Sequence, residues 1–262
     1  MEDVTLMEYL QMGPFPLPIN PPANPEPNTP NAQYNYSQIG AIGQWQEFNL
    51  PAIMQRYGNL MTATMIHSNP FINSPITSRP TKKTIWYAIS LQMMAKTRYA
   101  LRATFDRLQT TNQMNGITPL EFGLGAMAEN PGDLVPDTAY YLRAIQNEGE
   151  GPNRAPGEVK PSWKWSNSLR DGTPYEQKEF KQVLSQVNHY MKQHQARYGL
   201  VLTDRELVAI RRLNYDGDIE LSRPIPWDTR GTVEHPRLTV LLALWYIGML
   251  AAQDEGDESW QL

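Results

Sequence analysis

The chain has 262 residues, with 23 Lys or Arg and 27 Asp or Glu, so its formal net charge is -4 at pH 7. Hydrophobic residues make up 40% of the chain, which is enough for a globular body with a sizeable core. There is no cysteine, which excludes a disulfide scaffold, a Cys-ligated zinc site, an iron–sulfur cluster and a thiol nucleophile.

The first part of the chain is rich in proline. Residues 13–31 contain eight prolines, and proline lacks an amide donor and favours extended or disordered chain. We therefore predict that residues 1–38 are a disordered leader, in which residues 1–12 have the pattern of a short helix. The leader is interpreted as a flexible linker or as a docking peptide for a protein partner that reads proline-rich segments. It has no basic segment followed by an apolar run, so a secretory signal is not predicted.

The rest of the chain alternates between helical and strand patterns. Helices are predicted over residues 50–66, 84–110, 174–195 and 236–253, and strands over 120–127, 135–142, 157–164, 198–202, 207–213 and 219–225. This order predicts an α/β domain over residues 39–253, with a mixed central sheet flanked by helices. The run Leu238–Ala252 is too short to span a bilayer and is interpreted as a core helix. Residues 254–262 are predicted to be an acidic, solvated tail, and we expect an intracellular protein of the nucleus or cytoplasm without a membrane partner.

Three charged residues on two predicted strands form the candidate site. Asp137 follows Pro136, and Glu158 and Lys160 stand two positions apart in Gly-Glu-Val-Lys. Alternate residues of a strand point to the same face, so Glu158 and Lys160 share one side of the sheet. If the two strands are neighbours, Asp137 lies beside Glu158, and two adjacent carboxylates favour a hard divalent cation such as Mg²⁺. A metal-activated water, a clamped phosphate and a nearby lysine are the parts that phosphodiester hydrolysis uses.

These residues resemble the motif of the PD-(D/E)XK nuclease superfamily, which has the restriction-endonuclease-like fold. The resemblance runs from about residue 84 to residue 253, and the superfamily core of helix, three strands, helix and strand corresponds to the predicted order. It implies that Asp137 and Glu158 hold Mg²⁺ or Mn²⁺ together with the Val159 carbonyl, and that Lys160 orients the attacking water. The segment Gly157–Trp165 and the predicted closing helix are also similar to a group of fungal nuclease-like proteins of unknown role.

A further match lies in the next predicted helix, where Gln186 and Tyr190 form the Gln-x-x-x-Tyr pattern of the RecB-like and lambda-exonuclease-like branch. The two side chains are one turn apart on one helix face. The resemblance implies that they position the scissile phosphate or the lysine. It predicts a metal-dependent nuclease that acts on DNA, with RNA as an open alternative.

Two departures leave other functions open. Many members of this branch carry a glutamate on the first core helix, but the predicted helix 84–110 has Asp106 as its only acid. Asp133 is an alternative metal ligand near Asp137. The same fold could therefore be an inactive module that binds nucleic acid or protein. In a purely structural interpretation, Asp137 caps a turn, and Glu158 and Lys160 form an ion pair on the surface.

Positive charge is concentrated around the candidate site. Residues 153–212 contain eleven Lys or Arg against six Asp or Glu, although the whole chain is acidic. A local positive face is what phosphate-backbone binding requires. The predicted nucleic-acid contacts are Trp163, Lys164, Lys178 and Lys181, with base stacking on the Trp163 indole. Core packing of Trp163 and Trp165 is the alternative.

Overall fold

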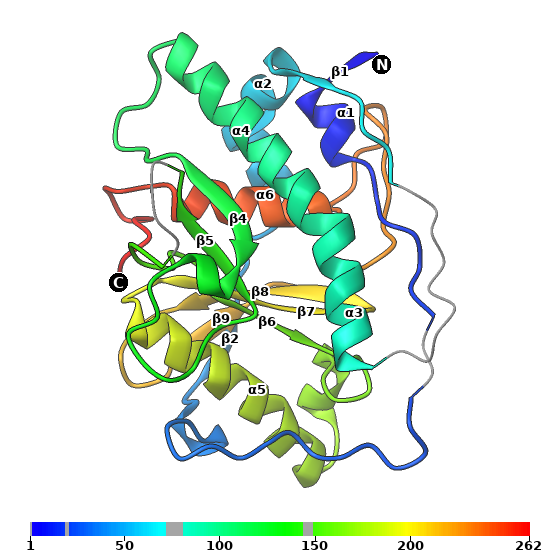
Figure 1. Cartoon of the computed structure of the whole chain (residues 1–262), viewed down its shortest axis with the longest axis vertical. Coiled ribbons are helices and arrows are strands. Elements are labelled where there is room, and N and C mark those ends of the chain that lie inside the picture. The colour runs from blue at the N-terminus through cyan, green and yellow to red at the C-terminus, as the bar shows by residue number, and fades with distance from the viewer. Residues whose placement is uncertain (1, 19–20, 72–80, 144–148) are drawn as a thin grey trace.

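The computed structural model describes residues 2–18, 21–71, 81–143 and 149–262 (Figure 1). The α-helices in these ranges are α1 (Leu6–Leu10), α2 (Leu50–Ala63), α3 (Lys82–Ile89), α4 (Ala95–Thr110), α5 (Pro174–Gln193) and α6 (Val240–Ala251). The strands are β1 (Asp3–Thr5), β2 (Ile42–Gln44), β3 (Met65–His67), β4 (Leu120–Leu124), β5 (Thr138–Leu142), β6 (Gly157–Lys160), β7 (Tyr198–Thr203), β8 (Glu206–Arg212), β9 (Ile219–Leu221) and β10 (Ile225–Pro226).

The main sheet has the strand order β2-β9-β8-β7-β6-β5-β4, with β10 paired to β8. β6 and β7 are parallel, as are β2 and β9, and the other pairs are antiparallel. The predicted mixed sheet flanked by helices is therefore confirmed. Along the chain, α4 is followed by β4, β5, β6, α5 and β7, which is the predicted element order.

The sheet separates two layers because its side chains alternate between faces. Leu200 and Leu202 of β7 lie in the core cluster that also contains α6 and the buried apolar residues of α4, whereas Val201 between them packs in the cluster of α5. β8 repeats this alternation. Figure 1 shows α4 and α6 on one side of the strands and α5 on the other.

The helices differ from the predictions at two points. The predicted helix 50–66 ends at Ala63, and Met65–His67 form strand β3 instead. The predicted helix 84–110 is divided into α3 and α4 by a π-helical turn over Ser90–Met94. α5 begins as predicted at Pro174, where Thr173 and Glu176 form a capping box. All twelve residues of α6 are buried, which confirms the predicted core helix. In the described ranges, no helix is long and apolar enough to cross a membrane.

The N-terminal residues differ from the predicted disordered leader. β1 pairs with β3, and α1 buries Leu6, Met7, Tyr9 and Leu10 in the same core cluster as α6. Farther along, the Trp227 indole donates to the Phe15 carbonyl, and Asn28 is bound to α5. The prediction of disorder is wrong for these residues. The apolar partners of α1 come from α2, α4 and α6, and the hydrogen-bond partners of Phe15 and Asn28 are Trp227 and α5, all of which are remote in sequence.

The acidic C-terminal tail also packs against the domain. Trp260 is buried, and the Arg154 guanidinium lies 4.7 Å from the centre of its ring. Arg154 also pairs with Asp254 at 2.7 Å, and Arg56 pairs with Glu258. Two acids of the tail, Asp254 and Glu258, are therefore paired with basic side chains of the domain, and the buried Trp260 anchors the tail. Residues 254–257 are exposed, as expected of a solvated acidic end, so the prediction is corrected only for the packed residue Trp260.

Candidate functional site

β6 presents the charged pair of the predicted motif to α5. Val159 packs in the cluster on the α6 side, so its neighbours Glu158 and Lys160 point to the opposite face. The Lys160 ammonium donates to the Glu158 carboxylate at 2.7 Å. Glu158 is 2% exposed and Lys160 is 9% exposed. The structure therefore contains a buried ion pair, and not the surface pair that the structural interpretation predicts.

α5 extends this pair into a chain of hydrogen bonds. The Gln186 carbonyl oxygen accepts a bond of 3.0 Å from Lys160 Nζ, and its amide donates to the Tyr190 hydroxyl at 2.8 Å. The predicted face of Gln186 and Tyr190 therefore lies against Lys160. Burial, and next the negative charge of Glu158, raise the pKa of Tyr190 well above its usual range. Tyr190 therefore remains a neutral hydroxyl at physiological pH.

Asp137 lies beside β6, as predicted. β5 and β6 are antiparallel neighbours with Thr138 opposite Gly157, and the Asp137 carboxylate accepts a bond of 2.9 Å from the Val159 amide. Asp137 also contributes to the raised pKa of Tyr190. A side chain at Gly125 would meet the Pro136 carbonyl at 1.7 Å, so the glycine permits the close approach that places Asp137.

Two carboxylates and one carbonyl are the groups that the resemblance implies as ligands of Mg²⁺ or Mn²⁺. The negative charges of Glu158 and, more weakly, Asp137 both contribute to the raised pKa of Tyr190. Oxygen donors are what these hard cations prefer, and magnesium in proteins is commonly held by one or two carboxylates together with phosphate oxygens and water. Asp137, Glu158 and the Val159 carbonyl are the groups that would hold it.

A third acid does not join this set in the described ranges. No group of three or more Asp, Glu or His residues stands there in an arrangement that could hold a metal ion. Asp106 of α4 pairs with Arg143, and Asp133 is exposed in its loop. Glu121 of β4 pairs with Arg102 and accepts from the Tyr141 hydroxyl.

The predicted nucleic-acid contacts have different surroundings. Trp163 is partly buried against the core, and Lys164 is half-buried in the turn after β6. Lys178 is exposed on α5, and Lys181 lies near Arg170 in a shallow cavity of about 230 Å³. Trp165, by contrast, is fully buried and stacks on Phe180 at 5.6 Å, so core packing is the correct interpretation for it.

Sequence analysis missed a contact from the N-terminal segment. The Tyr34 ring lies 5.9 Å from the His189 ring, and Tyr34 is a further influence on the pKa of its neighbour Tyr190. Tyr34 is only 6% exposed. More than 150 positions separate Tyr34 from His189, and no local pattern around Tyr34 signals the contact.

A buried polar network supports the strand that carries Asp137. The Asn153 side chain donates to the Thr138 carbonyl at 3.0 Å and accepts from the Tyr140 amide at 3.1 Å. His194, just after α5, accepts from the Asn153 amide at 3.2 Å. Asn153 and His194 are both buried, and their hydrogen bonds connect β5 to the end of α5.

We expect His194 to make the fold sensitive to acid. Burial lowers the pKa of His194 to about 4. The unfolded chain then binds the extra proton between about pH 6.5 and pH 4, so the free energy of unfolding falls across this window, by about 3 kcal/mol in total. Urea unfolding measured from pH 7 to pH 4 checks this result. The variant His194→Gln keeps an acceptor without titrating, and it should lose that part of the pH dependence; an unchanged profile would contradict it.

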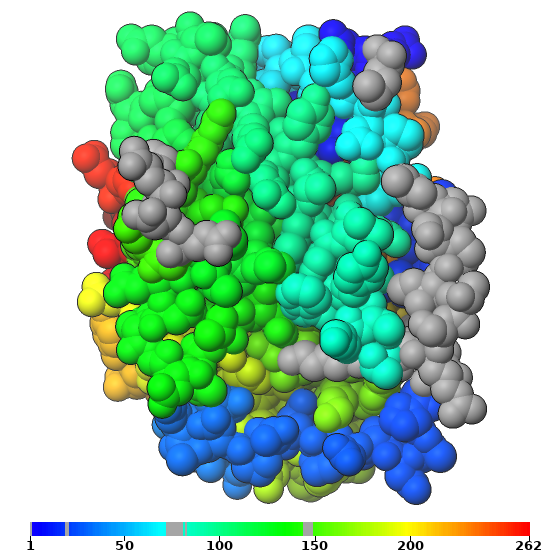
Figure 2. Space-filling model, viewed as in Figure 1, coloured from blue at the N-terminus to red at the C-terminus, as the bar shows by residue number. Residues whose placement is uncertain are grey.

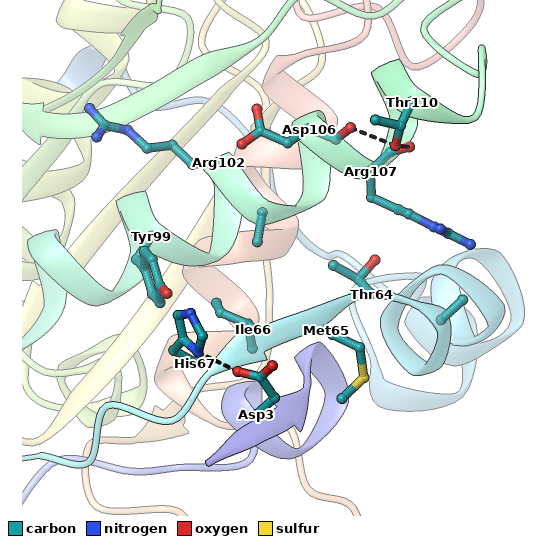
Figure 3. Close-up of a pocket in the computed structure, with 12 residues that line it drawn as sticks. Asp3, Thr64, Met65, Ile66, His67, Tyr99, Arg102, Asp106, Arg107 and Thr110 are labelled. Carbon is teal, nitrogen blue, oxygen red and sulfur yellow. Dashed lines mark hydrogen bonds and ion pairs between the residues drawn. The ribbon is translucent and has the colours of Figure 1, made fainter. Parts of the chain in front are cut away.

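A larger cavity lies elsewhere in the molecule (Figure 3). It has a volume of about 590 Å³ and is bounded by β3, α4 and Asp3. Its charged groups are largely paired: Asp3 with His67, Asp106 with Arg143 and Arg102 with Glu121. None of the predicted site residues lines it, and its paired charges offer no activated nucleophile or base.

Comparison of this chain with protein-family models, with curated proteins and with solved structures finds no match.

Proposed function

We propose that this protein is a metal-dependent nuclease that hydrolyses phosphodiester bonds of DNA, built on a restriction-endonuclease-like core. The observation that carries the proposal is the continuous contact from Glu158 through Lys160 and Gln186 to Tyr190, with Asp137 bound to the intervening Val159 amide. These are the residues expected to form one reaction centre, and they come from three segments of the chain: the residue before β5, β6 and α5.

Each of these residues has a separate role in the proposed phosphate hydrolysis. Lys160 is the cation paired with Glu158, so we assign it the role of orienting a water molecule and stabilising negative charge that develops on the phosphate. Gln186 fixes the lysine from the other side. Tyr190 accepts from Gln186, which leaves its own proton free to be donated to a phosphate oxygen.

The two carboxylates, with the Val159 carbonyl, are the proposed metal ligands. A bound Mg²⁺ or Mn²⁺ would supply Lewis acidity and lower the pKa of a coordinated water. Because only two acids contribute, affinity for the free ion should be weak and should increase when phosphate oxygens complete the coordination.

DNA cleavage assays with metal test the proposal. Linear single-stranded and double-stranded DNA should be cleaved with Mg²⁺ or Mn²⁺ and should stay intact with EDTA. Asp137→Asn preserves the shape of the side chain while removing its charge, and we expect it and Lys160→Ala each to lower the rate by at least about 10²-fold. Lys192→Ala, in the last turn of the same helix α5, is the matched control and should cleave normally. Cleavage that persists in Asp137→Asn would place the chemistry elsewhere.

One observation favours a second candidate, an inactive fold that binds nucleic acid or protein. The first long helix provides no acid to the site, since Asp106 is paired with Arg143. A protein of this kind would bind DNA with the salt dependence of phosphate contacts but would cleave none with any metal. Binding without cleavage therefore favours the binding module, and metal-dependent cleavage excludes it.

A further inference from the structure

The N-terminal segment Asn28–Gln38, here termed the strap, runs along α5. The Asn28 amide and side chain both donate to the Glu179 carboxylate, at 2.6 and 3.0 Å, and the side chain also donates to the Lys164 carbonyl. At the other end of the strap, the Tyr36 amide donates to Gln182 at 3.1 Å. Figure 2 shows blue atoms of the N-terminal region in front of the yellow-green atoms of α5.

The strap covers residues that the proposed function needs. Tyr34 packs on His189 next to Tyr190, and the Lys178 ammonium lies 5.2 Å from the centre of the Tyr36 ring. Lys164 is engaged through its carbonyl. Tyr190 is 2% exposed and Lys160 is 9% exposed, so a phosphate cannot reach them in this arrangement.

The strap buries fewer of its residues than the segments on either side of it. In residues 21–38, only Asn28 and Tyr34 are buried, whereas four of the five residues of α1 are buried. Beyond the strap, Ile39 is buried and the Gly40 amide donates to the Gly217 carbonyl at 3.0 Å, so the chain is anchored where a moving strap would pivot. The prolines before the strap lack amide donors, so that stretch has few bonds to break if the strap moves.

We propose that the strap is a removable cover of the candidate site, and that single-stranded DNA displaces it by competing for Lys164, Lys178 and the approach to Tyr190. The proposal rests on the proposed function for the identity of the competitor, but the cover itself can be tested without it. If only the uncovered protein binds DNA, the apparent affinity is the intrinsic affinity multiplied by the fraction of protein that is uncovered. Release of the strap increases that fraction and should therefore tighten DNA binding.

Release of the strap is tested with Asn28→Ala combined with Tyr34→Ala. Gln33→Ala, at an exposed position of the same segment, is the matched control. We expect the release variant to bind a short single-stranded oligonucleotide at least about tenfold more tightly than wild type, and the control to bind like wild type. Equal affinity of the release variant and wild type would overturn the proposal.

A spin label measures the motion of the strap directly. The chain has no cysteine, so Ser37→Cys gives a unique attachment point at an exposed strap position. The nitroxide should be restrained in wild type, mobile in the release variant and mobile in wild type after oligonucleotide is added. A label that is equally mobile in both proteins would overturn the cover. A label that responds to strap release, in a protein that binds and cleaves no DNA, would keep the cover and refute the nuclease function.

A reversible cross-link tests the proposal without the release variant, and so remains informative if that variant folds poorly. Asn28→Cys and Glu179→Cys, joined by a bismaleimide with a cleavable disulfide spacer, tie the strap to α5. We expect the cross-link to lower oligonucleotide affinity at least about tenfold and reductant to restore it. Binding that the cross-link leaves unchanged would overturn the proposal, while DNA cleavage in the same sample would leave the proposed function intact.

Discussion

Lys160→Met is expected to lower the free energy of unfolding by about 3–5 kcal/mol, because it leaves the Glu158 carboxylate buried without its ammonium partner. Glu158 is 2% exposed, and Lys160 Nζ lies 2.7 Å from its carboxylate oxygen. Breaking a buried pair in this way costs more than the pair contributes, since the remaining charge cannot return to water. Denaturant unfolding of wild type and variant at pH 7 measures the difference.

The double variant Glu158→Gln with Lys160→Met is the decisive comparison. It removes both charges at similar volume, so we expect it to recover most of the lost stability, or to exceed wild type. Lys83→Met, at an exposed lysine of α3, is the control and should shift the free energy by less than about 0.5 kcal/mol. Under the proposed function, the double variant should fold well and cleave no DNA. If Lys160→Met proves as stable as wild type, the pair is not closed in solution.

The stability of the double variant also tests why the Glu158–Lys160 ion pair is present. An apolar pair of the same volume would stabilise the fold at least as well, so a buried ion pair is weak evidence of a structural role. Perturbed and buried titratable groups concentrate at functional sites, although structural networks also contain them. The proximity of Asp137 and Tyr190 to this pair favours the functional explanation.

The candidate site could be predicted because its signals are local. Glu158 and Lys160 share a face through the period of two of a strand, and Gln186 and Tyr190 share a face through one helical turn. The pairing of β5 with β6 then required only a connection between consecutive strands. Asp137 follows from that pairing. The grouping of Asp137, Glu158 and Lys160 used residues of adjacent elements, whereas Gln186 and Tyr190 were assigned to the site through the resemblance to the nuclease superfamily.

The limits of strand β6 were harder to predict. The predicted strand continued to residue 164, but β6 ends at Lys160 because Pro161 cannot donate to the ladder. The chain then turns, and the Trp165 indole donates to the Phe180 carbonyl inside the α5 layer. Trp165, which lies just beyond the predicted strand, is therefore a packing anchor of the turn.

The N-terminal packing could not be predicted by periodicity. α1 has five residues, which is shorter than the window in which helical spacing is informative. Its partners are set by tertiary structure: the Leu6 amide donates to the Thr64 carbonyl, and the Thr239 hydroxyl donates to the Leu10 carbonyl. High proline content correctly predicts the absence of regular structure in residues 21–34, but it does not predict whether that chain is free or bound.

Deleting residues 1–12 should abolish cooperative folding, and this is the largest effect that we expect. The deletion removes β1 and four fully buried side chains, Leu6, Met7, Tyr9 and Leu10, which lie between α2, α4 and α6. Truncation of one buried leucine costs about 2–5 kcal/mol, and a typical domain has only about 5–15 kcal/mol in total. The loss of four such side chains, with the backbone bonds of the strand, therefore exceeds what a domain can sustain.

Thermal unfolding followed by circular dichroism and calorimetry measures this result. Leu6→Ala provides a graded comparison and should remain folded with a loss of about 3 kcal/mol. Pro22→Ala, in the exposed stretch of the same N-terminal region, should change the stability by less than about 0.5 kcal/mol. A truncated protein that unfolds at the wild-type temperature would mean that α1 does not contribute to the core. The N-terminal region would then be a leader along its whole length, and the hinged strap would lose its upstream anchor.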